Sequence, residues 1–355
     1  MPMTPPPAEP RAILVIRLSA IGDVVMASGI LPALRRAYPN AAIHWLVEPA
    51  AAPVIQGHPE LERVWVWPKG RWHDLLRRGH WRTLAREARA FTAELRGAGF
   101  DLALDLQGLW KSALWARLSG APTRIGLGSR EGSRVLMSRV VPITRGDPTM
   151  ASEYRRLVAE LGASEKAFAM APAAGEAARE GARTRLAEYG VTGPYTVLLP
   201  FTTRPQKHWI EARWAGLADR LAAETGQPVV IAGGPDDRAA AARILGQTTD
   251  GRMVDLAGTL GLAESVALVQ GATRAVGVDT GLTHVAVAAG APTVALFGST
   301  RPYLHTPSPR ARVLYSALDC SPCRRSPTCG GSFDCMAAHS VDAVADALAE
   351  LEATP

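Results

Sequence analysis

The sequence predicts an α/β protein built from two Rossmann-like domains, each with a parallel sheet, that face each other across a cleft. Three observations predict this fold class. The chain has 355 residues, which is more than one ordinary domain core needs. Short apolar runs alternate with segments of helical period in the first half of the chain, and the same alternation starts again in the second half.

The first half opens with the apolar run ILVIR, which is typical of a buried parallel strand. A loop and a helix follow, and the helix is expected to end before Pro39. The predicted strands are residues 13–17, 42–47, 64–67 and 100–105, and the predicted helices are residues 23–37, 81–98 and 109–118.

No strand pattern crosses the Ala-rich residues 163–181, which therefore separate the two series. The second series has predicted strands at residues 196–199, 228–232, 274–278 and 293–297, and predicted helices at residues 212–224, 238–245, 262–270, 282–289 and 341–351. The predicted organisation is a disordered tail (residues 1–10), an N-terminal domain (11–165), a linker region (166–192) and a C-terminal domain with a closing C-terminal helix (193–355).

Hydrophobic residues make up 47% of the chain and charged residues 20%, which excludes a disordered or fibrous protein. The longest nearly apolar run, residues 285–298, contains Gly290 and Pro292 and is too short to span a bilayer. The Pro-rich N-terminus lacks the pattern of a signal peptide. We therefore expect a cytoplasmic protein.

Positive charge and tryptophan are concentrated in residues 61–160, which hold 18 Lys and Arg against 10 Asp and Glu and six of the nine Trp. Such a surface suits an anionic partner: nucleic acid, a phosphosugar or an acidic membrane face. Alternatively, the Arg residues solvate helices and the Trp residues fill a core.

Ligands of open parallel sheets bind beyond the carboxyl ends of the strands, and unusual loops occupy that position here. The first loop, SAIGD, places Asp23 at a helix start. There it could act as an N-cap or as a base, and the two roles do not exclude each other. A second loop, PFTTRPQKHW, carries Thr202, Thr203, Arg204 and Lys207. Hydroxyls and cations together suit a phosphate site, although a solvated polar loop has the same composition.

A third loop, GVDTGLTH, brings backbone N–H groups and a hydroxyl to a helix start, where anions bind readily. Gly233 and Gly234 follow another strand and would permit close approach of a ligand. The chain has no GxGxxG, GxxxxGK[ST], HExxH or GxSxG motif. It also has no Asp-x-Asp to hold a metal, so a bound diphosphate is expected to be neutralised by Lys, Arg and helix N-termini.

Together, residues 19–24, 202–209 and 278–284, with the mid-domain motif LQGLWKS at 106–112, resemble glycosyltransferase family 9, the bacterial lipopolysaccharide heptosyltransferases. The resemblance runs from about Arg11 to Leu351 and is greatest for the heptosyltransferase I branch. It implies a GT-B fold and inverting transfer of heptose from ADP-heptose to the Kdo–lipid A inner core, without a required metal or cofactor. The alternatives are another nucleotide sugar, a later core acceptor as in heptosyltransferase II, or, remotely, a nucleic-acid-binding protein, which no motif supports.

The resemblance also implies the roles of the site residues, and it assigns acceptor binding to the N-terminal domain and nucleotide-sugar binding to the C-terminal domain. Asp23 matches the catalytic base, and Lys207 matches the cation that assists departure of the diphosphate. The donor-binding residues that the resemblance implies are Thr202, Thr203, Lys207, Asp279, Thr280, Gly281 and His284; Gly233 and Gly234 are added because glycines after a strand permit close approach. The expected acceptor-binding residues are Ser19, Gly22 and Gln107 in the motifs, together with Arg71, Arg77 and Arg78 of the basic segment 69–89.

The four cysteines, Cys320, Cys323, Cys329 and Cys335, form the pattern CSPC-x5-C-x5-C. A structural zinc or an iron–sulfur cluster, reduced thiols and a disulfide all remain open, and catalysis is not expected to require a metal there.

The basic segment 69–89 also contains Trp72 and Trp81. Its cations could meet the acidic sugars of the acceptor while the Trp rings sit among lipid headgroups. We therefore expect peripheral association with the inner leaflet of the cytoplasmic membrane. The alternative is an amphipathic helix that simply covers the sheet.

Overall fold

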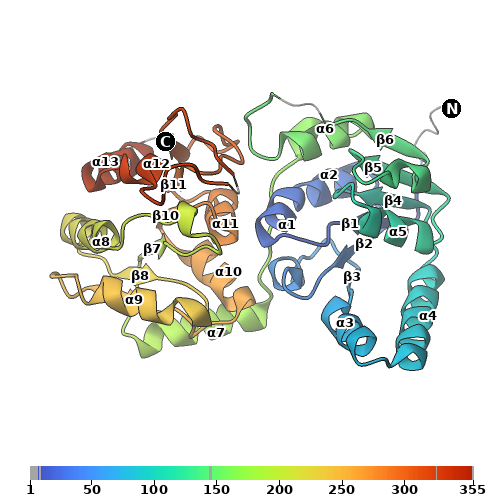
Figure 1. The fold of residues 1–355 in the computed structure, drawn as a ribbon, viewed down its shortest axis with the longest axis horizontal. Helices are drawn as coiled ribbons and strands as arrows, with labels where there is room; N and C mark the ends of the chain where they lie inside the picture. The colour runs from blue at the N-terminus through green and yellow to red at the C-terminus, as the bar shows by residue number, and fades with distance from the viewer. Residues whose placement is uncertain (1–6, 8, 144–145, 325, 354–355) are drawn as a thin grey trace. The chain divides into compact units, whose positions relative to one another are not determined.

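The computed structural model describes residues 7, 9–143, 146–324 and 326–353. These residues form two compact units (Figure 1). The first comprises the chain up to Asp147 together with Ala151–Pro172, and the second comprises Pro148–Met150 together with the chain from Ala173 onward. In the second unit, Thr149 forms an isolated parallel bridge with His305.

The first unit is a six-stranded parallel sheet with strand order β3-β2-β1-β4-β5-β6. In Figure 1, α2 and α6 lie next to each other and the α3–α4 pair extends below the sheet. Its elements are β1 (Ala12–Ile16), α1 (Ile21–Ala27), α2 (Ile30–Ala37), β2 (Ala42–Val47), η1 (Ala52–Val54), β3 (Arg63–Val66), α3 (Lys69–Arg77), α4 (Trp81–Gly97), β4 (Leu102–Asp105), α5 (Trp110–Leu118), β5 (Thr123–Leu127), η2 (Ser133–Leu136), β6 (Arg139–Val141), α6 (Ser152–Glu160) and η3 (Glu165–Ala167).

The second unit repeats this topology with strand order β12-β11-β10-β7-β8-β9, again all parallel. The C-terminal helix α13 packs on α8 and on the last two strands. Its elements are α7 (Glu176–Glu188), β7 (Thr196–Leu199), η4 (Pro205–Lys207), α8 (Glu211–Thr225), β8 (Val229–Ile231), η5 (Pro235–Asp237), α9 (Arg238–Leu245), β9 (Met253–Asp255), α10 (Leu262–Gly271), β10 (Arg274–Val278), α11 (Gly281–Ala289), β11 (Thr293–Phe297), β12 (Ala311–Tyr315), α12 (Asp334–Ala337) and α13 (Val341–Glu352).

The central strands are buried along their whole length because helices cover both faces of a parallel sheet. All five residues of β1 are buried, and so are all five of β10 and of β11. The sequence therefore predicts these strands correctly. It misses β5, β6, β9 and β12, which are short or lie toward the sheet edges and carry less continuous apolar runs.

The strand order reverses once in each sheet, between β1 and β4 in the first unit and between β7 and β10 in the second. Two neighbouring loops leave the sheet in opposite directions at such a reversal, and this opens a crevice at the carboxyl ends of the strands. The loops that follow β1, β4, β7 and β10 are the ones that carry the candidate site residues. A ligand is therefore expected at the reversal point of each sheet.

The prediction of a single helix over residues 23–37 is wrong. The structure has two helices here, α1 and α2, which are separated by Ser28 and Gly29. The Ser28 hydroxyl donates to the Val25 carbonyl at 2.6 Å and accepts from the Ala171 N–H at 2.9 Å. A Cβ at position 29 would come within 2.5 Å of the Phe168 ring. The break therefore receives the segment that ends the first unit, a long-range contact that local periodicity does not reveal.

The region predicted as a linker, residues 166–192, contains α7 and is divided between the two units at Pro172. Most of the tail predicted to be disordered, residues 1–10, lies outside the described residues. None of the described helices combines the length and the hydrophobicity that crossing a bilayer requires.

Candidate active site

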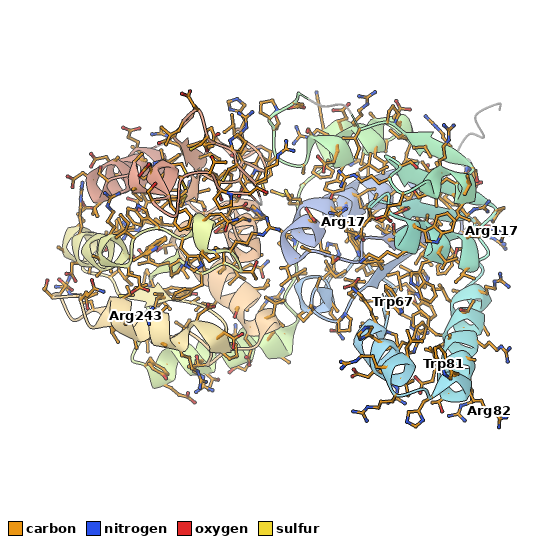
Figure 2. All side chains as sticks on the ribbon, in the orientation of Figure 1. Arg17, Trp67, Trp81, Arg82, Arg117 and Arg243 are labelled. Carbon is orange, nitrogen blue, oxygen red and sulfur yellow. The ribbon has the colours of Figure 1, made fainter. Side chains whose placement is uncertain are left out.

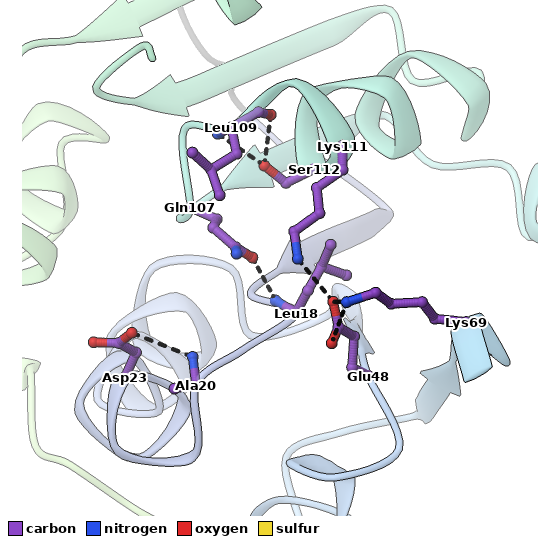
Figure 3. A network of polar contacts seen from close by, with 9 residues as sticks. All are labelled: Leu18, Ala20, Asp23, Glu48, Lys69, Gln107, Leu109, Lys111 and Ser112. Carbon is purple, nitrogen blue, oxygen red and sulfur yellow. Dashed lines mark hydrogen bonds and ion pairs between the residues drawn. The ribbon is translucent and has the colours of Figure 1, made fainter. Parts of the chain in front are cut away.

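Asp23 lies in the first turn of α1, directly after the loop that follows β1 (Figure 3). Its Oδ2 accepts a hydrogen bond from the Ala20 N–H at 3.2 Å, so the carboxylate does cap the helix. The same Oδ2 lies 2.5 Å from Nη2 of Arg17. Within the described chain, Oδ1 has no hydrogen-bond partner, and the side chain is 39% exposed. One oxygen is therefore held and the other is free to meet a ligand.

Arg17 holds Asp23 in place, a role that the sequence alone does not predict. Its guanidinium also donates to the Leu106 carbonyl at 2.8 Å and lies over the ring of Tyr154. The side chain is only 12% exposed. The signal for Arg17 in the sequence is a lone cation at the end of an otherwise apolar strand.

Gln107, a predicted acceptor residue, positions the loop that contains Ser19. Its Oε1 accepts from the Leu18 N–H at 3.0 Å (Figure 3). The turn that presents Gln107 is built on Asp105, which accepts from the Gln107 and Gly108 N–H groups and from the Ser112 hydroxyl. Burial raises the pKa of Asp105, and these donors counteract the shift. The side-chain oxygen of Gln107 is thus occupied within the protein.

Glu48, another residue whose role the sequence does not predict, joins the starts of α3 and α5 at this end of the sheet (Figure 3). It follows β2 directly and accepts from Nζ of Lys111 at 2.8 Å and from Nζ of Lys69 at 3.2 Å. Lys111 comes from the predicted mid-domain motif and Lys69 begins α3. These contacts fix the base of the α3–α4 pair next to the Gln107 turn.

The predicted acceptor residues of α3 differ in their surroundings. Arg71 forms a two-point ion pair with Glu87 of α4, which lowers the pKa of the Glu87 carboxyl. Arg77 and the adjacent Arg78 are exposed and form no ion pair with any described residue. Arg77 and Arg78 are therefore the freer cations of this group.

The prediction that Trp72 lies among lipid headgroups is wrong. Its ring packs against Trp67, Phe91 and Trp115, with ring centroids about 6 Å apart, so it is part of an aromatic core beneath α3 and α4. Trp81, at the start of α4, is 62% exposed (Figure 2). The tryptophans of this region thus divide between an aromatic core, which Trp72 shares with Phe91 and Trp115, and the surface, where Trp81 lies.

In the second unit, Asp279 gathers the predicted donor residues at the end of β10. Its Oδ2 lies 2.7 Å from Nζ of Lys207 and accepts from the Thr300 hydroxyl, and its Oδ1 lies 3.6 Å from Nε2 of His284. The backbone carbonyl of Asp279 accepts from the Thr202 hydroxyl at 3.4 Å and from Lys207 at 3.3 Å. The loops after β7 and β10 are therefore joined through one residue.

Asp279 is ionised at the pH at which proteins work. Burial by itself would raise the pKa of this carboxyl, but the His284 imidazole and the Lys207 ammonium outweigh burial and hold the pKa well below its usual range. The side chain of Asp279 is 11% exposed. A buried, ionised carboxylate is suited to hold an ammonium group in one position.

The other predicted donor residues lie around this cluster. Thr280 precedes α11 and Gly281 begins it, so the first N–H groups of this nine-residue helix face the loop. Thr203 is exposed, one residue after Thr202. Gly234 donates its N–H to Asp237 at 2.7 Å.

Gly233 also has a packing role that the sequence does not predict. A Cβ at this position would come within 2.4 Å of the Phe201 ring, so the missing side chain makes room for Phe201. The loops after β7 and β8 pack together here because position 233 is glycine.

The loop that contains the cysteines, residues 320–335, is hydrogen-bonded to the segment that contains Lys207. The Gln206 amide donates to the Arg324 carbonyl at 3.2 Å, and the Arg324 N–H donates to the Ser299 carbonyl at 2.7 Å. Cys335 is buried and the other three cysteines are half-buried. Over the ranges that the structure describes, no three Cys, His, Asp or Glu side chains converge as metal ligands would.

The comparisons with known proteins agree with the resemblance in the motifs. The model of glycosyltransferase family 9 (heptosyltransferase) matches residues 88–331. The chain is 33% identical to lipopolysaccharide heptosyltransferase 1 of Pseudomonas aeruginosa over 324 residues, which cover 89% of this chain and 87% of that protein. The chain belongs to glycosyltransferase family 9. The match confirms the predicted family and disfavours the nucleic-acid alternative.

Solved structures of the family confirm the fold class. The structure of a family 9 glycosyltransferase from Veillonella parvula superposes with a TM-score of 0.82 at 22% identity and covers 97% of this chain and 98% of that one. The E. coli heptosyltransferase WaaC with ADP-2-deoxy-2-fluoro heptose has a TM-score of 0.70 at 26% identity, over 96% of this chain and 99% of that one. The two parallel α/β sheets are thus those of the GT-B enzymes in this family.

The lowered pKa of Asp279 predicts how one substitution changes stability with pH. An unfolded Asp titrates at about pH 4, above the folded-state value, so the carboxylate stabilises the fold above that pH. This stabilisation is lost as the pH falls through the folded-state pKa. We expect Asp279→Asn to lower the free energy of unfolding most at neutral pH, with the gap to wild type narrowing below about pH 4.

Urea unfolding from neutral to acid pH measures this gap. Asp342→Asn is the control, because its exposed carboxylate pairs with Arg220 at the surface and should cost little at any pH. A deficit of Asp279→Asn that stays constant with pH would contradict a stabilising charge.

Proposed function

We propose that this family 9 glycosyltransferase transfers heptose from ADP-heptose to the Kdo–lipid A inner core of lipopolysaccharide, with inversion and without a metal. One observation carries the chemistry: each parallel sheet presents a fixed charge of the needed sign at its reversal point. The first unit presents the Asp23 carboxylate and the second presents the Lys207 ammonium. The 33% identity to a lipopolysaccharide heptosyltransferase 1 supports the donor and the acceptor.

Asp23 supplies the base in this proposal. Its free Oδ1 takes the proton from the acceptor hydroxyl, and the hydroxyl oxygen forms a bond to the anomeric carbon of the heptose at the same time. The bond from this carbon to the diphosphate breaks on the opposite face, so the configuration inverts. Arg17 keeps the carboxylate oriented between turnovers.

Lys207 and its neighbours receive the leaving group. ADP departs with the bonding electron pair, and the added charge on its phosphate oxygen needs donors already in position. Lys207, the Thr202 and Thr203 hydroxyls and the first N–H groups of α11 provide them. A protein-held metal is not needed for this charge balance.

We further propose that the α3–α4 pair docks on the anionic membrane that holds the acceptor. Arg77 and Arg78 are exposed and unpaired among the described residues, and Trp81 lies close by in the chain, at the start of the next helix (Figure 2). Cations at such a surface contribute about 1 kcal/mol each, and an exposed Trp suits the headgroup region.

The reaction is tested with purified protein, Kdo₂–lipid A and a panel of nucleotide sugars in the presence of EDTA, with mass spectrometry as the readout. We expect one heptose to be added from ADP-heptose and ADP to be released. Transfer from another nucleotide sugar alone would contradict the donor. Activity that EDTA abolishes and Mg²⁺ restores would contradict the metal-free mechanism.

Asp23→Asn is expected to lower kcat by about 10²–10⁴-fold, the usual contribution of a general base, with ADP binding preserved. Asp101→Asn is the matched control, since Asp101 also accepts backbone N–H groups in the first unit but at the amino end of the sheet. Turnover of Asp23→Asn equal to that of the control would leave Asp23 only its role as a cap.

Replacement of Arg77 and Arg78 by Gln is expected to weaken binding to vesicles containing anionic lipid by about 10–30-fold, since two cations are lost. KM for the lipid acceptor should rise and KM for ADP-heptose should stay unchanged. Arg183 and Arg185 of α7, replaced by Gln, form the control with the same change in net charge. Equal effects of both pairs would contradict docking through α3.

A further inference from the structure

A buried tyrosine outside the four motifs contacts the Asp279 cluster. Tyr303 follows β11 and is 1% exposed, with its ring packed edge-on against Phe297 at 5.1 Å between centroids. Its hydroxyl lies 2.9 Å from Nδ1 of His284. Nothing in the sequence separates Tyr303 from an ordinary core residue.

The contact between Tyr303 and His284 determines which imidazole nitrogen carries the proton. Burial, together with the charge of Asp279, raises the pKa of Tyr303 well above its usual value, so the hydroxyl keeps its hydrogen. Within the described chain the only hydrogen-bond partner of this hydroxyl is Nδ1 of His284. A buried donor needs an acceptor, so Nδ1 accepts and Nε2 carries the proton.

The proton on Nε2 points at the site. Nε2 lies 3.6 Å from Oδ1 of Asp279, so an N–H there presents its positive end to the carboxylate. With the opposite tautomer, a nitrogen lone pair would face the carboxylate and the tyrosine hydrogen would have no acceptor. Oδ2 of the same carboxylate holds Lys207 at 2.7 Å and accepts from Thr300.

We propose that Tyr303 is a positioning residue that locks His284 in the Nε2–H tautomer and thereby fixes Asp279 and Lys207 for the departing diphosphate. The link to the diphosphate rests on the proposed function. Tyr303 itself contacts neither substrate nor the reacting atoms in this proposal. It acts through His284, which orients one oxygen of Asp279 while the other oxygen holds the cation.

Tyr303→Phe tests the proposal, because it removes the hydroxyl and keeps the ring that packs on Phe297. The first readout is the nitrogen-15 NMR spectrum of the His284 side chain, assigned with His284→Asn. We expect a single Nε2–H tautomer in the wild type and a mixture of tautomers in Tyr303→Phe. This readout needs no substrate, so its result does not depend on whether the protein transfers heptose.

The second readout is kinetic. Loss of the positioning bond should lower kcat by about tenfold, with KM for the acceptor unchanged. Tyr195→Phe is the matched control. Tyr195 immediately precedes β7 and is buried in the same unit, and its hydroxyl donates to the Leu268 carbonyl at 2.6 Å. It should lower the thermal midpoint and leave kcat and the His284 spectrum unchanged.

Three results would overturn the proposal. A wild-type proton on Nδ1 of His284 would exclude the tautomer. An unchanged spectrum and kcat in Tyr303→Phe would exclude the positioning role. An equal loss of kcat in Tyr195→Phe would show that the effect comes from general loss of stability.

Discussion

The reversal of strand order in each parallel sheet is the constraint on which the rest of the structure depends. A parallel strand is covered by helices on both faces, so its polar chemistry can only lie in the loops at its ends. Where the order reverses, two adjacent loops leave room for a ligand. The loops after β1 and β4 meet at one reversal, and those after β7 and β10 meet at the other. Every charged group of the proposed mechanism lies on one of these four loops or at the helix or 3₁₀ turn that follows.

Both candidate centres hold their functional charge with a buried or half-buried charge of opposite sign. Arg17 holds Asp23 in the first unit, and Asp279 holds Lys207 in the second. Removing one partner of such a pair costs more stability than the pair contributes, because the remaining charge is left without compensation. Each pair therefore fixes the position of its charges although it adds little net stability to the fold. This suits a site that must present its charges before the substrate arrives.

The sequence was sufficient for the fold class and for the loops of the site because both have local signals. Short, largely apolar strands such as β1, β7 and β10 are recognised from four or five residues, and the motifs around Asp23, Lys207 and Asp279 follow these strands. Residues that act through distant contacts gave no such signal. The role of Glu48 is visible only in the folded structure, where it accepts a hydrogen bond from Lys111, 63 positions away. Phe168 looks like an ordinary apolar residue until it fills the space above Gly29.

Neither unit is one uninterrupted stretch of chain, which constrains how its parts can be exchanged. The chain leaves the first unit after Asp147, contributes Thr149 to a bridge with His305 in the second, returns at Ala151 and leaves again at Pro172. A hybrid enzyme that takes its first unit from one relative and its second from another therefore needs three matched junctions. A single crossover at the middle of the sequence would separate Phe168 from Gly29 or Thr149 from His305. A hybrid of two relatives should accordingly take Pro148–Met150 from the same relative as its second unit.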